Sequence, residues 1–251
     1  GCYPGFKEEP TDTDERWDPR ETGHCSINPD SGFFFYPEWS GRPKGSRKVL
    51  IIGGGVSGMQ AALTAKARGH RPVLVEQQDH LGGTLCFTDR DMDKADLREF
   101  KNTLIRQVRD AEIDVRLGVQ ADPEYIRSEE PDVVLLAIGA APARPPIPGI
   151  EYGMNALEVY THPERIGDSV LIIGGGLVGC EVALHLAGLG RQVTVAELQN
   201  RLAPEAIHMY RSALMEELEK RKVSMHLGLR CLEIGSTIAV CRTEGGQNST
   251  L

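Results

Sequence analysis

The 251-residue sequence has little positive charge, few aromatic side chains and no long apolar run. Its 28 Lys and Arg against 36 Asp and Glu give a net charge of −8. Nucleic acids and anionic membrane surfaces both need a basic face, so neither is expected as the main partner. The longest apolar run, residues 133–141, is far shorter than the roughly 20 residues of a membrane-spanning helix. No basic start followed by an apolar core marks a signal peptide, and we expect a cytoplasmic protein.

Cysteine and histidine lack the spacing of familiar sites. The six cysteines are scattered and form no Cys-x-x-Cys pair. This disfavours both a disulfide scaffold and a redox-active pair of that kind. The histidines form no spaced metal-binding set, so we assign none of them a role.

Glycine, in contrast, is abundant, and its placement repeats. The stretch "VLIIGGGVSGMQAA" (49–62) recurs 121 residues later as "VLIIGGGLVGCEVA" (170–183). In each copy, Gly-x-Gly-x-x-Gly follows an apolar strand and opens a helix. An acid then ends the next strand, Glu76 in the first copy and Glu197 in the second, with the same offset.

This arrangement is typical of a dinucleotide-binding unit. The first glycine permits a tight turn, the second lets the backbone approach a pyrophosphate, and the third lets helix and strand pack closely. The helix N-terminus favours the pyrophosphate anion, and the acid accepts hydrogen bonds from the ribose hydroxyls. Glycines that serve packing alone are the alternative. Two complete copies favour two different dinucleotides, and the natural pairing is a flavin with a nicotinamide, between which hydride passes.

The order of elements predicts an α/β fold with two Rossmann-like dinucleotide-binding domains. Residues 1–46 show no helix or strand period and form an irregular arm. The first domain is expected at 47–150, a connector at 151–168 and the second domain at 169–251. In the first domain we expect strands 48–52, 72–76, 113–117 and 132–138 and helices 56–69 and 93–110. In the second half we expect strands 170–173, 193–196, 223–227, 230–234 and 237–242 and helices 177–189 and 204–221.

Two segments of the first half resemble flavoprotein reductases that carry two dinucleotide-binding domains. "LAIGAAP" (136–142) resembles their Ala-Thr-Gly segment, with Ile138 where Thr is usual, and "QQDHLGGTL" (77–85) resembles the Gly-Gly stretch of their FAD half. The resemblance places FAD in the first half and the nicotinamide nucleotide in the second. The implied FAD contacts are Gly53, Gly55, Val56, Ser57, Gly58, Glu76, Gly82, Gly83, Thr84, Val119, Ala137 and Gly139. The implied nicotinamide-nucleotide contacts are Gly174, Gly176, Leu177, Val178, Gly179 and Glu197.

The stretch "HCSINPDSG" (24–32), together with "IPGI" (147–150) and "VTVAE" (193–197), narrows the resemblance. These segments resemble the 2,4-dienoyl-CoA reductase and 2-enoate reductase group of the NADH:flavin oxidoreductase family, which is related to Old Yellow Enzyme. The resemblance covers most of residues 25–245. Such proteins carry an N-terminal TIM barrel with FMN, a four-cysteine [4Fe–4S] site, and then FAD and NAD(P) domains. A TIM-barrel FMN domain or subunit is therefore an implied partner.

Two cysteines of the arm match part of that cluster site. Cys25 corresponds to the last cluster cysteine and Cys2 to the third, with a longer loop between them than usual. A [4Fe–4S] cluster needs four thiolates, so this pair supplies two metal ligands; two ordinary free thiols are the alternative. The family's returning Gly-Asp segment is also missing after the second domain. We therefore expect a FAD domain that is incomplete at the C-terminus, in a fragment or a subunit completed by a partner.

The resemblance implies an NAD(P)H:flavin oxidoreductase of which this chain is the electron-input module. Hydride would pass from NADH to FAD and on to an iron–sulfur and FMN ene-reductase module. Two alternatives remain open. One is the structural nucleotide-binding module of an amine-dehydrogenase-like flavoprotein, and the other is a small electron-transfer subunit of another oxidoreductase.

Two acids of the second half predict how the nicotinamide nucleotide is oriented and which nucleotide is preferred. By resemblance, Glu181 in the first turn of its helix is the catalytic residue that approaches and orients the nicotinamide. Its alternative role is complementarity to the helix N-terminus, worth about 0.3–1 kcal/mol. Glu197 favours NADH over NADPH because a carboxylate repels a 2′-phosphate, whereas Arg201 could pair with that phosphate.

Overall fold

The structure is a computed structural model that describes residues 45–243 and 245–251. Cys2, Cys25 and nearly all of the expected arm lie outside the described residues. The chain divides into two compact units, one containing residues up to Gly83 with Glu99–Ile138 and the other Thr84–Arg98 with Gly139–Leu251. Each unit has its own parallel sheet, which confirms the predicted α/β fold. No helix among the described residues is long and apolar enough to cross a membrane.

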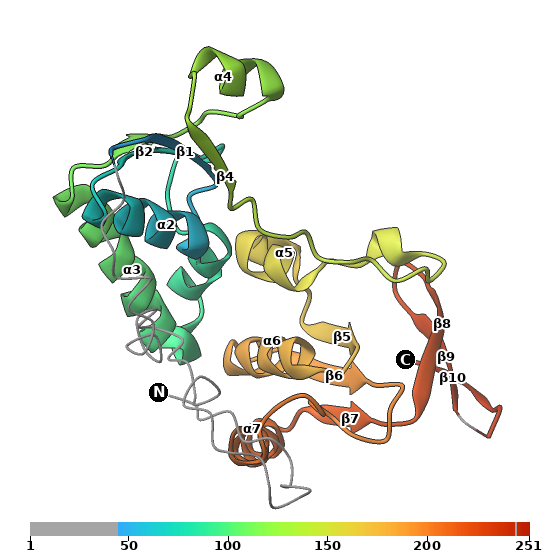
Figure 1. Ribbon diagram of the computed structural model, residues 1–251. Coiled ribbons are helices and arrows are strands. Elements are labelled where there is room, and N and C mark those ends of the chain that lie inside the picture. The colour runs from blue at the N-terminus through green and yellow to red at the C-terminus, as the bar shows by residue number, and fades with distance from the viewer. Residues whose placement is uncertain (1–44, 244) are drawn as a thin grey trace, which may run out of the picture. The chain divides into compact units, whose positions relative to one another are not determined.

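The first unit is built on a four-stranded parallel sheet with the order β3-β2-β1-β4 (Figure 1). Helix α2 connects β1 to β2, α3 precedes β3 and contributes its residues from Glu99 onward, and α4 connects β3 to β4. The strands are β1 (Lys48–Ile52), β2 (Arg71–Val75), β3 (Asp114–Arg116) and β4 (Val133–Leu136). The helices are α2 (Val56–Ala67), α3 (Ala95–Asp110) and α4 (Pro123–Ser128).

The apolar sequence of β1 follows from its central place, because a parallel strand is covered on both faces. On one face Ile51 packs in a cluster with Met59 of α2 and Val108 of α3. On the other face Leu50 packs with Val73 and Val75 of β2. The carboxyl ends of these strands therefore stand at one edge of a rigid, two-sided core.

The second unit has a three-stranded parallel sheet with the order β5-β6-β7, followed by a separate antiparallel sheet with the order β10-β9-β8. Its parallel sheet and helices are α5 (Ala156–Thr161), β5 (Ser169–Ile173), α6 (Leu177–Gly188), β6 (Gln192–Ala196), α7 (His208–Lys220) and β7 (Ser224–His226). The antiparallel strands are β8 (Leu229–Ile234), β9 (Ala239–Thr243) and β10 (Asn248–Thr250). Short 3₁₀ helices occur at Gly83–Asp89, Met92–Lys94, Ile150–Tyr152 and Pro163–Arg165.

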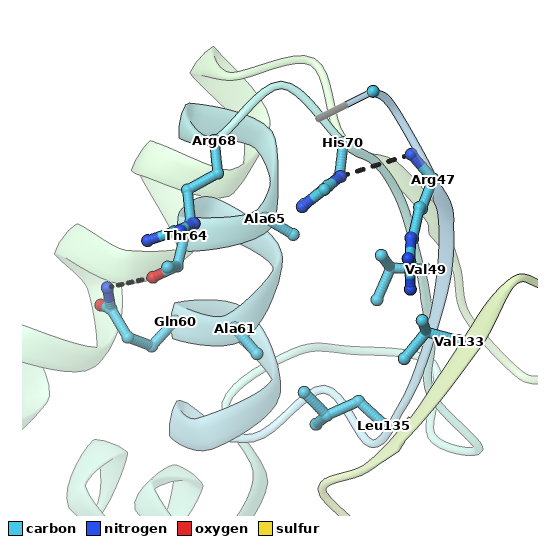
Figure 2. Close-up of a pocket in the computed structure, with 11 residues that line it drawn as sticks. Arg47, Val49, Gln60, Ala61, Thr64, Ala65, Arg68, His70, Val133 and Leu135 are labelled. Carbon is cyan, nitrogen blue, oxygen red and sulfur yellow. Dashed lines mark hydrogen bonds between the residues drawn. The ribbon is translucent and has the colours of Figure 1, made fainter. Parts of the chain in front are cut away.

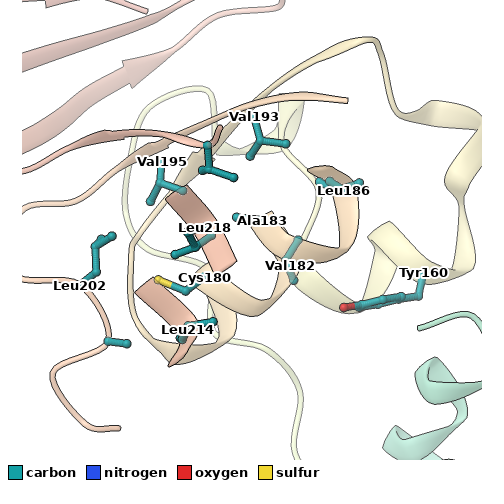
Figure 3. Packing of buried hydrophobic residues seen from close by; sticks show 12 residues of the cluster. Tyr160, Cys180, Val182, Ala183, Leu186, Val193, Val195, Leu202, Leu214 and Leu218 are labelled. Carbon is teal, nitrogen blue, oxygen red and sulfur yellow. The ribbon is translucent and has the colours of Figure 1, made fainter. Parts of the chain in front are cut away.

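Helix α6 forms the centre of the second unit's core (Figure 3). Its buried apolar residues, among them Cys180, Ala183 and Leu186, pack in one cluster with residues of β6 and α7. The fully buried members of this cluster include Cys180, Ala183, Leu186, Val195, Ala203 and Leu218. The glycine loop that precedes α6 is thereby held against the end of β5.

Most of the predicted elements are present, with four notable differences. The helix expected at 204–221 begins only at His208, after a turn in which Ala203 has a positive φ of 42°. Helix α5 was missed, although Asn155 and Glu158 form the reciprocal capping box that marks a helix start. Helix α4, capped by the Asp122 side chain, and the short strand β10 were also missed.

Candidate functional site

Two glycines of the first loop are required by close backbone contacts. A Cβ on Gly53 would lie 2.3 Å from the carbonyl oxygen of Ala137, and Gly53 has a φ of +110°. A Cβ on Gly58 would lie 1.8 Å from the carbonyl oxygen of Gly53. The first glycine therefore permits the turn, and the third lets α2 pack against the end of β1.

The middle glycine of this loop faces open space. The nearest heavy atom to a Cβ on Gly55 would be the Cα of Gly83 at 3.8 Å, an ordinary contact. The protein itself would thus accept a side chain there. Its absence leaves room at the first turn of α2, where Val56 and Ser57 present backbone amides. This opening fits a pyrophosphate, which binds at helix N-termini.

The Gly82-Gly83 stretch packs directly on that loop. The Gly82 N–H donates to the carbonyl oxygen of Gly54 at 2.9 Å. Both glycines have positive φ values, 123° and 55°, and a Cβ on Gly83 would lie 2.8 Å from the Cα of Gly55. Thr84, which follows, is exposed. The predicted Gly-Gly contact therefore lies next to the glycine loop of the same unit.

Glu76 ties the end of β2 to the glycine loop. Its Oε2 accepts from the Gly54 N–H at 2.5 Å and its Oε1 from the Gln78 N–H at 2.8 Å. The side chain is buried, with only 8% of the residue exposed. A carboxylate has about four acceptor positions, so it retains capacity for ribose hydroxyls. Glu76 therefore orders the loop as well as presenting an acceptor at the strand end.

The second half repeats these contacts at the same offset. Gly174 has a φ of +104°, and a Cβ on Gly179 would lie 2.0 Å from its carbonyl oxygen. The carboxylate of Glu197 accepts from the Gly175 N–H at 2.5 Å and from the Gln199 N–H at 2.7 Å. Glu197 is also 8% exposed. The duplication seen in the sequence is therefore a duplication of the local structure.

The second loop differs from the first at its middle glycine. The Glu205 carboxylate accepts a hydrogen bond from the Leu177 N–H at the start of α6. A Cβ on Gly176 would lie 3.1 Å from the Glu205 Oε1. The backbone bond from Leu177 holds the pKa of Glu205 below its usual value. An anionic side chain thus occupies the amide at which the motif predicts a pyrophosphate, and the neighbouring Val178 is exposed.

The remaining predicted flavin contacts stand at the carboxyl ends of the strands. The Val119 N–H donates to the carbonyl oxygen of Glu76 at 2.9 Å, and the Ala137 N–H donates to that of Ile52 at 2.8 Å. Gly139 has a φ of +69° and is exposed. Ligands of open α/β sheets bind at this edge.

Glu181 is held by two partners that sequence reasoning missed. The Lys94 Nζ lies 2.5 Å from its Oε1, and the Tyr210 hydroxyl donates to the same oxygen. Burial alone would lower the pKa of Lys94, but the bond to Glu181 and its charge raise it above the ordinary value. Burial and the bond to Glu181 also raise the pKa of Tyr210. The sequence gives no signal for this grouping, because the three residues come from separate segments.

A second buried polar cluster anchors residues 84–98 within their unit. The Tyr160 hydroxyl donates to Asp91 at 2.9 Å, and the His185 Nδ1 lies 3.9 Å from the other oxygen of this carboxylate. Burial lowers the pKa of His185 and, together with the charge of Asp91, raises that of Tyr160. Asp91 is only 1% exposed. This cluster fastens the segment that carries Lys94 to α5 and α6.

A cavity of about 620 Å³ in the first unit lies away from the glycine loop (Figure 2). It is lined by residues of α2, β1 and β4, together with Arg47 and His70. These two residues stand at the amino ends of β1 and β2, opposite the edge where ligands of such sheets bind. The cavity is therefore not the candidate dinucleotide site.

Among the described residues, no group of three or more His, Cys, Asp or Glu side chains could hold a metal ion. The predicted cluster ligands Cys2 and Cys25 are not among these residues, so the iron–sulfur hypothesis stays a prediction.

Comparisons with known proteins agree with this geometry. Residues 47–248 match the family described as pyridine nucleotide-disulphide oxidoreductase. The chain is 36% identical over 232 residues to the NADH oxidase of Thermoanaerobacter brockii, covering 89% of this chain and 36% of that protein. It is 38% identical over 185 residues to the cinnamate reductase of Clostridium sporogenes, covering 71% of this chain and 27% of that protein.

Among solved structures, a 2-naphthoyl-CoA reductase in complex with 2-naphthoyl-CoA superposes with a TM-score of 0.85 at 28% identity. The match covers 90% of this chain and 35% of that one. The chain thus spans about a third of the length of the relatives it matches. FAD and NAD(H) are the cofactors expected of this family, and the chain belongs to the pyridine nucleotide-disulphide oxidoreductases as a flavin- and nicotinamide-dependent oxidoreductase module.

Proposed function

We propose that the chain is the electron-input module of a larger flavin-dependent ene-reductase of the 2,4-dienoyl-CoA and 2-enoate reductase type. The proposed FAD domain comprises residues 47–150 and the proposed nicotinamide domain residues 169–251, joined by the connector 151–168. The first glycine loop and Glu76 would hold FAD, which when bound would supply a hydride acceptor for NADH. In the complete protein the electrons would continue to a [4Fe–4S] cluster, with Cys2 and Cys25 among its ligands, and to FMN in a TIM-barrel domain or subunit.

The observation that carries the proposal is the pair of complete glycine loops with equivalent acids. Each loop has a strand before it, a helix after it, and a buried carboxylate bonded to the loop backbone. Close packing explains Gly53, Gly58 and Gly179, and the positive φ explains Gly174, but neither explains the open space at Gly55. Space for a ligand at a helix N-terminus is what a dinucleotide requires.

The relatives support the reductase part of the proposal. Two of them are named as reductases, of cinnamate and of 2-naphthoyl-CoA. Because this chain covers only 27% of the first and 35% of the second, its own acceptor is inferred by analogy. The sequence segment 24–32, which resembles the end of a cluster motif, is an independent reason for the same choice.

Within the second unit, the proposed chemistry assigns a role to Glu181. Lys94 and Tyr210 hold one of its carboxylate oxygens, which fixes the side chain just after the first turn of α6; the first turn itself, where the sequence placed Glu181, contains no acidic residue. Within the described part of the chain, the bonds given to Glu181 all involve Oε1, and the proposal assigns Oε2 as the acceptor for the nicotinamide carboxamide. We therefore propose that Glu181 orients the nicotinamide and that Lys94 and Tyr210 position Glu181.

Anaerobic titration of the FAD-loaded protein with NADH tests the function. We expect NADH to bleach the visible absorbance of the flavin, and Glu181→Gln to slow the bleaching with little change in FAD content. Glu219 is an exposed glutamate of α7. The variant Glu219→Gln therefore serves as a charge-matched control. A flavin that stays oxidised while the protein binds nucleotide would favour the alternative of a structural nucleotide-binding module.

A further inference from the structure

Two cysteines that lie apart in the sequence become direct neighbours in the second unit. Strands β8, β9 and β10 form an antiparallel sheet (Figure 1), and Cys231 of β8 pairs with Cys241 of β9 in its register. Both are free thiols. Neither takes part in the proposed nucleotide site.

The hydrogen bonds of β9 show what kind of pair the cysteines form. Ala239 exchanges two backbone bonds with Leu251, at 2.8 and 3.0 Å, and the Thr243 N–H donates toward the same side at 2.9 Å. Alternate residues of an antiparallel strand point their backbone groups to the same neighbour. Cys241 lies midway between Ala239 and Thr243, so its backbone groups also point to β10. Toward β8 it therefore forms a non-hydrogen-bonded pair with Cys231.

This pair type has the geometry that a disulfide needs. Its Cα atoms are about 4.5 Å apart and its side chains are closer than in hydrogen-bonded pairs. Disulfides span Cα separations of about 4.4–6.8 Å. The register of β8 shifts by one residue between Cys231 and Glu233, so the pair is the last before a β-bulge, and the separation typical of its pair type lies at the short end of the disulfide range. Strained disulfides are more easily reduced, so this bond would be reversible.

The surroundings determine which thiol meets an oxidant first. Cys241 is fully buried and Cys231 is half-buried, and both pack against Ala196 and Leu229. Burial, followed by the charge and hydrogen bond of Cys231, raises the pKa of Cys241 to about 11. Cys231 is therefore the entry point and Cys241 the resolving thiol.

We propose that Cys231 and Cys241 are a redox modification site, oxidised by hydrogen peroxide to a disulfide that dithiols reverse. The Cys231 sulfur attacks one peroxide oxygen, the O–O bond breaks, and a sulfenic acid and one water form. The Cys241 sulfur then attacks the Cys231 sulfur. The S–S bond forms, and the departing hydroxide leaves as a second water with the Cys241 proton. The two thiols lose two electrons and two protons, and the peroxide is reduced to two waters.

The disulfide would join β8 to β9, and the first residue of β8 is hydrogen-bonded to the proposed ribose acid. The Leu229 N–H, close before Cys231 on β8, donates to the carbonyl oxygen of Glu197 at 2.8 Å. Ala196, which packs against the cysteine pair, directly precedes Glu197. The modification site is thus built onto the end of β6, although its formation does not depend on any bound nucleotide.

Peptide mass spectrometry of the purified chain tests the proposal. The reduced protein is treated with a small excess of hydrogen peroxide, alkylated and digested, with and without later dithiothreitol. We expect a peptide pair joined through Cys231 and Cys241, lost on reduction, and unaffected by the control change Cys86→Ser. In Cys241→Ser, we expect a dimedone adduct on Cys231 in place of the bond.

Three outcomes would overturn the proposal. The two thiols could stay fully alkylated while other cysteines oxidise, or Cys231 could pair mainly with another cysteine. The same bond could also form only after the protein is unfolded in urea, which would show that the native register does not bring the thiols together. Because the wild-type chain supplies the primary result, none of these outcomes depends on the folding of a variant.

Discussion

Replacing Glu205 by Gln should tighten NADH binding rather than weaken it. In the structure its carboxylate accepts a hydrogen bond from the Leu177 N–H and lies over Gly176. That amide belongs to the helix N-terminus at which we propose the NADH pyrophosphate binds. Two anions cannot share it, so NADH must displace the carboxylate. In the first loop, no side chain of the described residues is bonded to the corresponding amide of Val56.

The size of the effect follows from the position of the group. Glu205 is exposed, and an exposed anion at a helix N-terminus is worth about 0.3–1 kcal/mol. Removing its charge should lower the Kd for NADH roughly two- to fivefold, since about 1.4 kcal/mol corresponds to a factor of ten. Screening by salt should shrink the difference. Because the Leu177 bond lowers the pKa of Glu205, the carboxylate stays ionised across neutral pH. The difference in Kd between wild type and Glu205→Gln should therefore be constant across neutral pH and disappear only in acid.

The assay is a titration followed by NADH fluorescence at two salt concentrations. Glu205→Gln removes the charge but retains an acceptor, and Glu205→Ala removes both, so Ala should bind at least as tightly as Gln. Glu219→Gln changes the net charge equally from an exposed position on α7 and should leave the Kd unchanged. If both Glu205 variants bind NADH no better than wild type, the carboxylate does not compete, and the reasoning fails.

Three further changes test the two loops. Glu76→Ala should weaken FAD binding by about 1–3 kcal/mol, the cost of buried polar groups left without a partner; an unchanged flavin affinity would contradict the assignment. Compared with wild type, Glu197→Ala should have a lower kcat/KM with NADH and a higher kcat/KM with NADPH. If the wild type instead prefers NADPH and Arg201→Ala removes that preference, Arg201 is the determinant. Gly58→Ala should destabilise the fold by about 3 kcal/mol or more because its Cβ would meet backbone at 1.8 Å. Gly167→Ala, whose nearest contact would be 3.7 Å, should be near neutral in the same urea titration.

The repeat was readable in the sequence because each of its parts is local. A strand, three glycines, a helix and an acid lie within about thirty residues, and each supplies its own physical signal. The structure adds a contact that the motif alone does not state, the hydrogen bond that each acid accepts from one N–H of the glycine loop. Glu76 and Glu197 make equivalent bonds, so the acids also have a structural reason to be present.

The groupings that were missed depend on segments distant in the chain. Lys94 reaches Glu181 only because residues 84–98 pack within the second unit, and Asp91 meets Tyr160 for the same reason. No periodicity in the sequence reports such packing. The missed helix α5 is a different case, since its Asn155–Glu158 capping box is a local pattern that the sequence itself contains.

The cysteine pair shows how register creates chemistry that spacing does not reveal. Cys231 and Cys241 fit no Cys-x-x-Cys pattern, and in an extended chain they would be far apart. The hairpin of β8 and β9 makes them neighbours. A one-residue slip of that register would turn one of the thiols to the opposite face.

The two halves share one motif, yet their proposed ligands have different requirements. A flavin that relays electrons must stay bound through every turnover, whereas a nicotinamide nucleotide must leave after each one. The loops differ in the way this contrast requires. The space at Gly55 is open, while at Gly176 the protein supplies its own anion through Glu205. If the Glu205 carboxylate competes with the pyrophosphate for the Leu177 N–H, it raises the Kd of the nicotinamide nucleotide. It then favours release after hydride transfer, because the carboxylate bonds to the Leu177 N–H again. A glutamate introduced so that it accepts a bond from the Val56 N–H should then make the bound flavin exchangeable. The expected result is faster loss of FAD on dilution. An unchanged rate of loss would show that this amide does not determine how long FAD stays bound.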